Sequence, residues 1–190
     1  MDIFNKPLPN FDKSWTLFLD RDGVLNHEKH LDYIHKWDEF IFYPDVKEAL
    51  QICANIFNRI IVVTNQRGVG KGMTLEVDLH IIHQNMKDEV AQAGGSIDRV
   101  YYCPDLNNES QNRKPNAGMA FQAKLDYPEI DFNKSVMVGN NLSDMGFGRK
   151  IGSYNVFVKT THPEQQNEEG MIDLMTDSLF SFSKQLVKAH

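Results

Sequence analysis

Two carboxylates and a glycine, Asp20, Asp22 and Gly23, follow an apolar run at residues 17–19. Such a run predicts a buried strand, which would place both acids at its carboxyl end, where open α/β sheets bind their ligands. Two like charges this close repel each other unless a cation or a shared proton relieves them. The pattern therefore favours a metal site, although Asp-x-Asp-Gly is also an ordinary turn sequence.

A second apolar run, residues 60–63, is followed by Thr64, Asn65 and a glycine-rich stretch over 66–72. A hydroxyl, an amide and flexible backbone at a strand end offer donors to a phosphate. The stretch is not a Walker A loop, because that motif needs Gly where Asn65 lies and Ser or Thr where Gly72 lies. Its alternating glycines also do not fit the dinucleotide pattern Gly-x-Gly-x-x-Gly. A phosphate loop and a plain connector both remain open.

Two more polar clusters come later in the chain. Arg113 and Lys114 precede Pro115, which favours a fixed entry into the following helix. A lysine held there would neutralise an anionic intermediate, whereas an unconstrained basic pair would be solvated. A fourth apolar run ends before Asn140 and Asp144, which alone would be a turn and a helix cap. Because the clusters recur at successive strand ends, we expect them to form one site.

The elements that must position these residues alternate along the chain. Short apolar runs predict strands, and amphipathic stretches between them predict helices, with Thr74 as the N-cap of one. The alternation predicts one doubly wound α/β domain over residues 1–190, with a parallel sheet and right-handed crossovers. The expected strands are 17–19, 60–63, 100–102, 136–138 and 156–158, and the expected helices are 45–57, 75–92, 117–126, 143–150 and 178–188.

Composition limits the classes of function. A chain of 190 residues with 41% apolar residues can bury one sizeable core. The net charge of −6 opposes nucleic-acid binding, which depends largely on clustered Lys and Arg. No apolar segment is long enough to span a bilayer, and the start of the chain lacks the features of a signal peptide. We therefore expect a cytoplasmic protein without membrane or nucleic-acid partners, and a monomer by default.

Taken together, these clusters resemble the four motifs of the haloacid dehalogenase-like (HAD) phosphohydrolases over residues 15–158. The finer pattern is similar to the branch of histidinol phosphatases and heptose bisphosphate phosphatases. The resemblance implies a Rossmann-like core with a minimal cap or none, so that only segments 27–43 and 104–113 frame a substrate. The matching stretches are Asp20–Asn26, Tyr33–Pro44, Thr64–Gly68, Tyr102–Pro104, Arg113–Met119 and Gly139–Asp144.

The same resemblance implies a mechanism through an aspartyl-phosphate. Asp20 would be the nucleophile, and Asp22 the general acid and then the general base. Thr64 and Asn65 would hold the phosphoryl oxygens, while Lys114 offsets negative charge. A small phosphorylated metabolite, such as histidinol phosphate or a sugar bisphosphate, would be the substrate.

The residues implied to contact the substrate beyond the reacting phosphate are Asn26, Arg67 and Arg113, the two arginines being suited to a second anionic group.

The implied metal is Mg²⁺, bound by Asp20, Asp22, Asn140 and Asp144. Asn140 replaces the aspartate usual at its position, and because a hard cation prefers carboxylate we expect weaker binding. Zinc is not expected, because Cys103 alone remains of a loop that carries several zinc ligands in relatives.

Two other functions stay open at this stage. The glycine-rich stretch after Thr64 also resembles the phosphatase half of polynucleotide kinase/phosphatases, which implies removal of 3′ phosphate from nucleic-acid ends. The substitution at Asn140 raises a non-catalytic alternative, a protein that binds a phosphate ligand without turning it over. Turnover of a generic phosphate ester separates this last alternative from the two enzymes.

Overall fold

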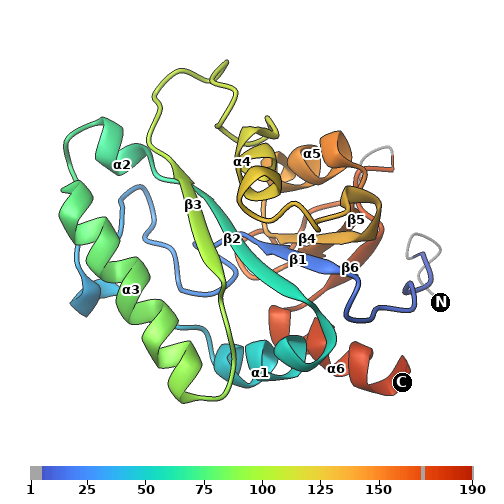
Figure 1. Cartoon of the computed structure of the whole chain (residues 1–190). Helices are drawn as coiled ribbons and strands as arrows, with labels where there is room; N and C mark the ends of the chain where they lie inside the picture. Colours follow the sequence, from blue (N-terminus) through green and yellow to red (C-terminus); the bar gives the residue numbers. More distant parts are fainter. Residues whose placement is uncertain (1–5, 168–169, 190) are drawn as a thin grey trace.

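The computed structural model describes residues 6–167 and 170–189 and contains a six-stranded parallel sheet (Figure 1). The strand order is β3-β2-β1-β4-β5-β6, so β1 lies between the two halves of the sheet. This order is that of a Rossmann-like doubly wound fold, as predicted. The strands are β1 Thr16–Leu19, β2 Arg59–Asn65, β3 Arg99–Cys103, β4 Ser135–Gly139, β5 Tyr154–Val158 and β6 Leu174–Thr176.

Helices cover both faces of the sheet. Figure 1 shows α4 and α5 on one face and α1 and α6 together on the other, and α3 packs against α1. The helices are α1 Val46–Ile56, α2 Arg67–Gly70, α3 Glu76–Gln92, α4 Gly118–Asp126, α5 Leu142–Ile151 and α6 Leu179–Ala189, with short 3-10 turns η1 Trp37–Glu39 and η2 Phe132–Lys134. No helix in the described part of the chain has the length and apolar character needed to cross a membrane.

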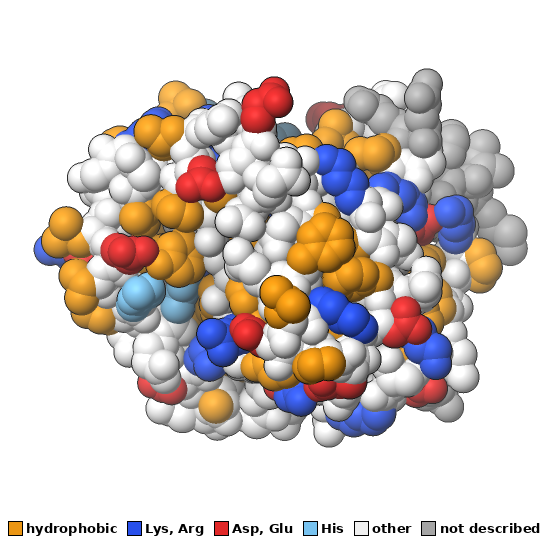
Figure 2. All heavy atoms as spheres, turned by 45° about the horizontal axis from the view of Figure 1, so that its top comes forward, with side chains coloured by type: hydrophobic (Ala, Val, Ile, Leu, Met, Phe, Trp, Pro, Cys, Tyr) orange, Lys and Arg blue, Asp and Glu red, His pale blue; other side chains and the backbone are white. Residues whose placement is uncertain are grey.

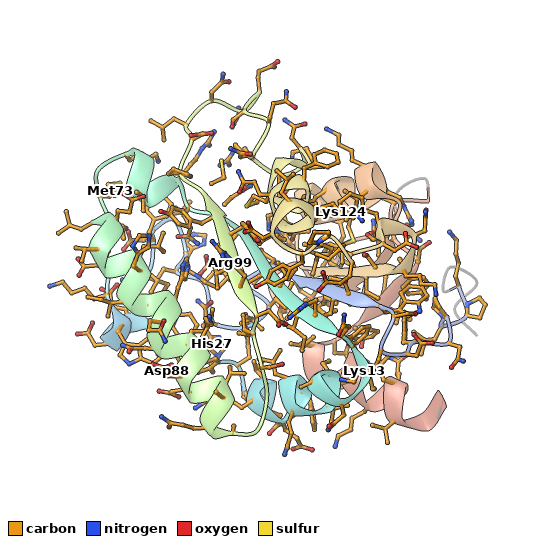
Figure 3. All side chains as sticks on the ribbon, viewed as in Figure 1. Lys13, His27, Met73, Asp88, Arg99 and Lys124 are labelled. Atoms are coloured by element: carbon orange, nitrogen blue, oxygen red, sulfur yellow. The ribbon has the colours of Figure 1, made fainter. Side chains whose placement is uncertain are left out.

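The alternation of side chains along β1 divides the core into two layers. Leu17 and Leu19 belong to the cluster beneath α1, α3 and α6, whereas Phe18 belongs to the cluster beneath α4 and α5. Both neighbours of β1 run parallel to it, so Leu17 pairs with Ile60 on one side and Val136 on the other. Side chains fill the space between the sheet and the helices (Figure 3). A strand buried on both faces explains why its sequence is continuously apolar.

The structure corrects the sequence prediction at three places. Strand β6 and the single-turn helix α2 were not predicted. Thr74 is not a helix cap: the N-cap of α3 is Leu75, which makes no side-chain cap bond. The Thr74 hydroxyl instead bonds to His35 Nδ1 at 2.8 Å, because segment 27–43, which precedes α1, packs against α3.

The reversal of strand order at β1 determines where a ligand binds. Strand β2 extends the sheet on one side of β1 and β4 extends it on the other, which leaves a crevice beyond the carboxyl end of β1. Segment 27–43 turns back across this end through a bridge between Asn26 and Phe42 and contains only η1. Trp37, Phe40 and Phe42 from this segment pack against the core, which anchors it.

The Phe18 ring is fully buried and lies 6.0 Å from the Phe147 ring. We predict that Phe18→Ala lowers the free energy of unfolding by about 3 to 5 kcal/mol, because it leaves a cavity in the layer under α4 and α5. Phe121→Ala is the matched control, since Phe121 is 54% exposed, and it should cost less than about 1 kcal/mol. Urea denaturation of both variants checks this, and equal losses would contradict the assignment of Phe18 to the core.

Candidate active site

A cavity of about 340 Å³ opens at the carboxyl edge of the sheet, where the four predicted clusters meet. It is bounded by strand ends from β1, β2 and β4 and by the segment before α4. The predicted residues that line it are Asp20, Asp22, Thr64, Asn65, Arg113, Lys114, Asn140 and Asp144, and Glu28, Asn141 and Ser143 line it as well. The cavity is therefore polar and strongly charged.

Lys114 connects two carboxylates in this cavity. Its Nζ lies 2.8 Å from Asp20 Oδ1 and 2.6 Å from Asp144 Oδ1, and the residue is only 3% exposed. The Asn65 side chain fixes the Lys114 backbone from both sides: its Oδ1 accepts the Lys114 N–H at 3.0 Å, and its Nδ2 donates to the Lys114 carbonyl at 3.2 Å. Asn65 thus positions the lysine, a contact that sequence reasoning did not foresee.

Asp144 uses both carboxylate oxygens within the protein. Oδ1 pairs with Lys114, while Oδ2 accepts the backbone N–H groups of Asn140 at 3.1 Å and Asn141 at 3.0 Å. With Asn141 as the N-cap, this forms a capping box at the start of α5. Asp144 therefore fixes the lysine on one side and the loop carrying Asn140 on the other.

Burial dominates the charge state of Asp20. It raises the pKa of the Asp20 carboxyl to about 7, against the opposing attraction of Lys114. Burial also acts to lower the pKa of Lys114, but Asp144 and Asp20 outweigh it, so that this pKa is raised and the ammonium stays charged. A cation placed beside Asp20 would add to Lys114 in favouring the ionised carboxylate.

Asp22 lies in a different environment, although it is two residues away. Burial acts to raise its pKa, but the Arg21 guanidinium and hydrogen bonds from Asn26 and Gln66 lower it overall. Arg21 Nη2 and Asn26 Nδ2 donate to Oδ1 at 2.8 and 2.9 Å, and Gln66 Nε2 donates to Oδ2 at 2.8 Å. The same Gln66 nitrogen donates to Thr64 Oγ1 at 2.9 Å. The Thr64 hydroxyl hydrogen is therefore free to be donated into the cavity.

A buried arginine and histidine lie behind Asp22. Arg21 is 1% exposed, and its Nη1 lies 3.1 Å from Nε2 of His83 on α3. Burial, with a smaller contribution from the Arg21 charge, lowers the pKa of His83 to about 3. The neutral ring therefore accepts the guanidinium N–H. Sequence reasoning missed this link, because Arg21 and His83 are brought together only by the packing of α3.

Asn140 carries an acceptor with no partner in the described structure. Its Oδ1 is buried and unbonded, while its Nδ2 donates to Thr161 Oγ1 at 2.7 Å. Gly23 packs directly against this amide: at its φ of +84° a Cβ would lie 2.1 Å from Asn140 Nδ2. Only glycine is therefore compatible with this contact.

The residues present fit a hard divalent cation through oxygen. No cluster of three His, Cys, Asp or Glu side chains with metal-binding geometry occurs among the described residues. The orphaned Asn140 oxygen shares the cavity with the carboxylates of Asp20 and Asp22, and oxygen donors of this kind suit Mg²⁺. The Asn140 amide would thus supply a neutral oxygen donor beside the Asp20 carboxylate.

The other predicted substrate contacts separate into two groups. Arg113 lines the cavity, and both Arg113 Nη1 and Arg67 Nε are buried donors without a partner among the described residues. Burial and the nearby Arg67 charge lower the pKa of Arg113. Arg67 also donates to the Leu106 carbonyl at 3.0 Å and thereby holds the loop over 104–113. Asn26 is fully buried and contacts Asp22 rather than the cavity.

Comparisons with known proteins find phosphatases among the relatives of this chain. The family model described as polynucleotide kinase 3 phosphatase matches residues 10–178. A D-glycero-alpha-D-manno-heptose-1,7-bisphosphate 7-phosphatase from Mycobacterium bovis is 33% identical over 170 residues, which cover 89% of this chain and 90% of that protein. A probable heptose bisphosphate phosphatase from Thermoplasma volcanium is 38% identical over 138 residues, 72% of this chain and 92% of its own.

A solved structure shares the fold over almost its whole length. The D,D-heptose 1,7-bisphosphate phosphatase from B. bronchiseptica, complexed with magnesium and phosphate, superimposes with a TM-score of 0.81. The match covers 93% of this chain and 99% of that one at 26% sequence identity. Magnesium and phosphate in that crystal structure suit the donor set described above.

The buried His83 gives a pH-dependent stability that can be measured. Arg21, Asp22 and His80 influence this ring, and its folded-state pKa of about 3 lies below the unfolded value of 6.5. The contribution of the neutral His83 ring to the free energy of unfolding is therefore full above pH 6.5. It is lost as the pH falls, because the unfolded state binds the proton first. We predict that the free energy of unfolding falls by about 1 kcal/mol less in His83→Gln than in the wild type when the pH is lowered from 7.5 to 5.5. Urea denaturation at both values measures it, and an identical pH dependence in both proteins would contradict a neutral buried ring.

Proposed function

Because the chain belongs to the polynucleotide kinase 3 phosphatase family of HAD-like phosphatases, we propose that it hydrolyses a small sugar bisphosphate of the heptose 1,7-bisphosphate type. The observation that carries this proposal is the buried Lys114, which holds the Asp20 carboxylate at the cavity. The relatives named as heptose bisphosphate 7-phosphatases cover most of the chain, which supports this substrate class. The reaction is hydrolysis of a phosphate monoester.

In the proposed mechanism, Asp20 attacks phosphorus in line with the departing alkoxide. The bond from phosphorus to the sugar oxygen breaks as the bond to the Asp20 carboxylate forms. Water then attacks the phosphorus of the aspartyl-phosphate, releasing inorganic phosphate and restoring the carboxylate. Lys114 stabilises negative charge on Asp20 and the phosphoryl group, and the free hydrogen of the Thr64 hydroxyl is donated to a phosphoryl oxygen.

Asp22 performs the proton transfers in this scheme. Its side chain is 26% exposed, and it lines the cavity beside Asp20. The protonated Asp22 carboxyl donates its proton to the leaving alkoxide, and the resulting carboxylate, the form that its lowered pKa favours, then removes a proton from the attacking water. The bonds from Arg21, Asn26 and Gln66 fix where the carboxylate lies between these two steps. We therefore assign Asn26 to positioning Asp22 rather than to direct substrate contact.

Mg²⁺ would be held by the Asp20 carboxylate, the main-chain carbonyl of Asp22 and Asn140 Oδ1. It would reduce the repulsion between a carboxylate nucleophile and a phosphate dianion. The Asp144 oxygens already bond to Lys114 and to backbone N–H groups, so we assign Asp144 to positioning rather than to the metal. We also propose that the loop over 104–113 needs no zinc, because bonds from Arg67 to the Leu106 carbonyl and between Ser110 and Asp105 hold it.

The second phosphate of the substrate is assigned to Arg113, with Arg67 beside it. Both side chains carry buried N–H groups without partners in the described structure, and an anion would satisfy them. Arg113 already lines the cavity that contains Asp20. Two adjacent guanidinium groups favour a doubly charged group over a neutral part of the substrate.

The family description also brings phosphorylated nucleic-acid ends into consideration. The surface does not favour them: on the face shown in Figure 2, Lys and Arg side chains are interspersed with Asp and Glu rather than gathered in one stripe. The net charge of −6 acts in the same direction, since backbone phosphates are bound by clustered cations. A sugar bisphosphate is therefore the better candidate.

A substrate panel tests the proposal. We predict that heptose 1,7-bisphosphate is hydrolysed with a higher kcat/KM than histidinol phosphate or a 3′-phosphorylated oligonucleotide. Arg113→Gln should raise the KM for the bisphosphate about tenfold or more, the expected loss for a bond to a charged group, and leave the KM for a monophosphate nearly unchanged. Preference for the oligonucleotide would favour nucleic-acid repair, and no turnover of any ester would favour a binding protein.

A second prediction concerns the nucleophile. Asp20→Asn should abolish turnover while the substrate still binds, because the amide cannot form the phosphoryl ester but keeps the shape of the site. Asp22→Asn should retain slow activity, since general acid–base help contributes roughly two to four orders of magnitude. Steady-state kinetics and calorimetric binding measure both variants. Full activity of Asp20→Asn would refute the mechanism.

A further inference from the structure

Thr161 and His162, which follow β5 in the chain, contact the proposed metal ligand Asn140. The Asn140 Nδ2 donates to Thr161 Oγ1 at 2.7 Å, and the hydroxyl oxygen lies 2.9 Å from His162 Nδ1. The same ring nitrogen lies 3.0 Å from the main-chain oxygen of Asn140. These contacts link the side chains of Asn140, Thr161 and His162 and return to the Asn140 main chain. Neither Thr161 nor His162 belongs to the motifs found in the sequence.

The hydrogen bonds in this group place the amide nitrogen of Asn140 toward Thr161 and the amide oxygen away from it. A carbonyl oxygen only accepts, so the contact from the Asn140 main chain requires a hydrogen on His162 Nδ1. That nitrogen therefore has no lone pair to offer the Thr161 hydroxyl. The hydroxyl oxygen can accept hydrogen bonds through its two lone pairs, and one of these receives the amide N–H of Asn140 at 2.7 Å.

The result is an unbonded, buried amide oxygen. Asn140 Oδ1 has no partner in the described structure, although buried acceptors normally have one. Asn140 itself is 2% exposed and lines the cavity with Asp20. We propose that Thr161 and His162 are positioning residues that hold the Asn140 amide with its oxygen available to the divalent cation.

An amide needs this control more than a carboxylate does. Either oxygen of an aspartate can bind a cation, so rotation of the group by half a turn changes nothing. Rotation of an asparagine amide would replace the oxygen by an NH₂ group, which repels a cation. The Thr161 contact therefore compensates for the amide at position 140. This inference rests on the proposed function, because it concerns the cation of the same site.

Other contacts hold the segment that carries Thr161. The Lys159 N–H donates to the Thr176 carbonyl at 2.9 Å, and the Thr160 hydroxyl donates to the Gly23 carbonyl. The segment therefore does not depend on the Thr161 hydroxyl for its course. A substitution at Thr161 should change the amide without unfolding the loop.

Cation binding without substrate tests the role of Thr161. Free Mn²⁺ is measured by electron paramagnetic resonance during titration of the wild type, Thr161→Val and Thr161→Ser. We expect Thr161→Val to raise the Kd for Mn²⁺ by about 3- to 10-fold, the value of one buried hydrogen bond. Thr161→Ser should restore the wild-type Kd to within about twofold, because it keeps the hydroxyl. An unchanged Kd in Thr161→Val would overturn the inference.

The same titration in an Asn140→Asp background separates orientation from a general effect on the loop. Because a carboxylate presents an oxygen in either rotation, Thr161→Val should then leave the Kd unchanged. A loss of affinity equal to that in the wild-type background would show that Thr161 acts through the loop and would overturn the inference. Failure of the wild type itself to bind Mn²⁺ or Mg²⁺ would instead overturn the proposed metal site, and the positioning role with it.

Discussion

The pairing of the Lys114 ammonium with Asp20 and Asp144 is the interaction on which the site depends. A buried charge is costly unless it is paired and hydrogen-bonded, so these groups fix one another's positions. Two carboxylates and one ammonium leave the group with an excess of negative charge when ionised. That excess makes the cavity receptive to a divalent cation, and the cation in turn makes it receptive to a phosphate.

The rest of the structure holds this arrangement in place. The change of strand order at β1 brings the carboxyl ends of β1, β2 and β4 to one crevice. Asn65 at the end of β2 binds the Lys114 backbone, and the capping box of α5 fixes Asp144. Stability of the fold and geometry of the site are thus linked, because the bonds that end the elements also position the reacting groups.

Most of the strands and the position of the site could be predicted from the sequence, because both depend on local patterns. Buried strands appear in the sequence as apolar runs, and the polar residues that follow them identify the carboxyl edge of the sheet. Strand β6, Leu174–Thr176, was missed because it contains only two consecutive apolar residues, fewer than each of the predicted strands. The links from Arg21 to His83 and from Asn140 to Thr161 were missed for another reason. Each joins residues far apart in sequence, and no local pattern indicates such a pair.

The most direct test of the account identifies the residue that becomes phosphorylated. Enzyme mixed rapidly with heptose 1,7-bisphosphate and Mg²⁺ is quenched in acid and treated with borohydride, which reduces an acyl phosphate to the alcohol. Peptide mass spectrometry then locates the modified side chain. If Asp20 is the nucleophile, homoserine is found at position 20 and nowhere else. Reduction at Asp22 or Asp144, or rapid product formation without any modified aspartate, would contradict it.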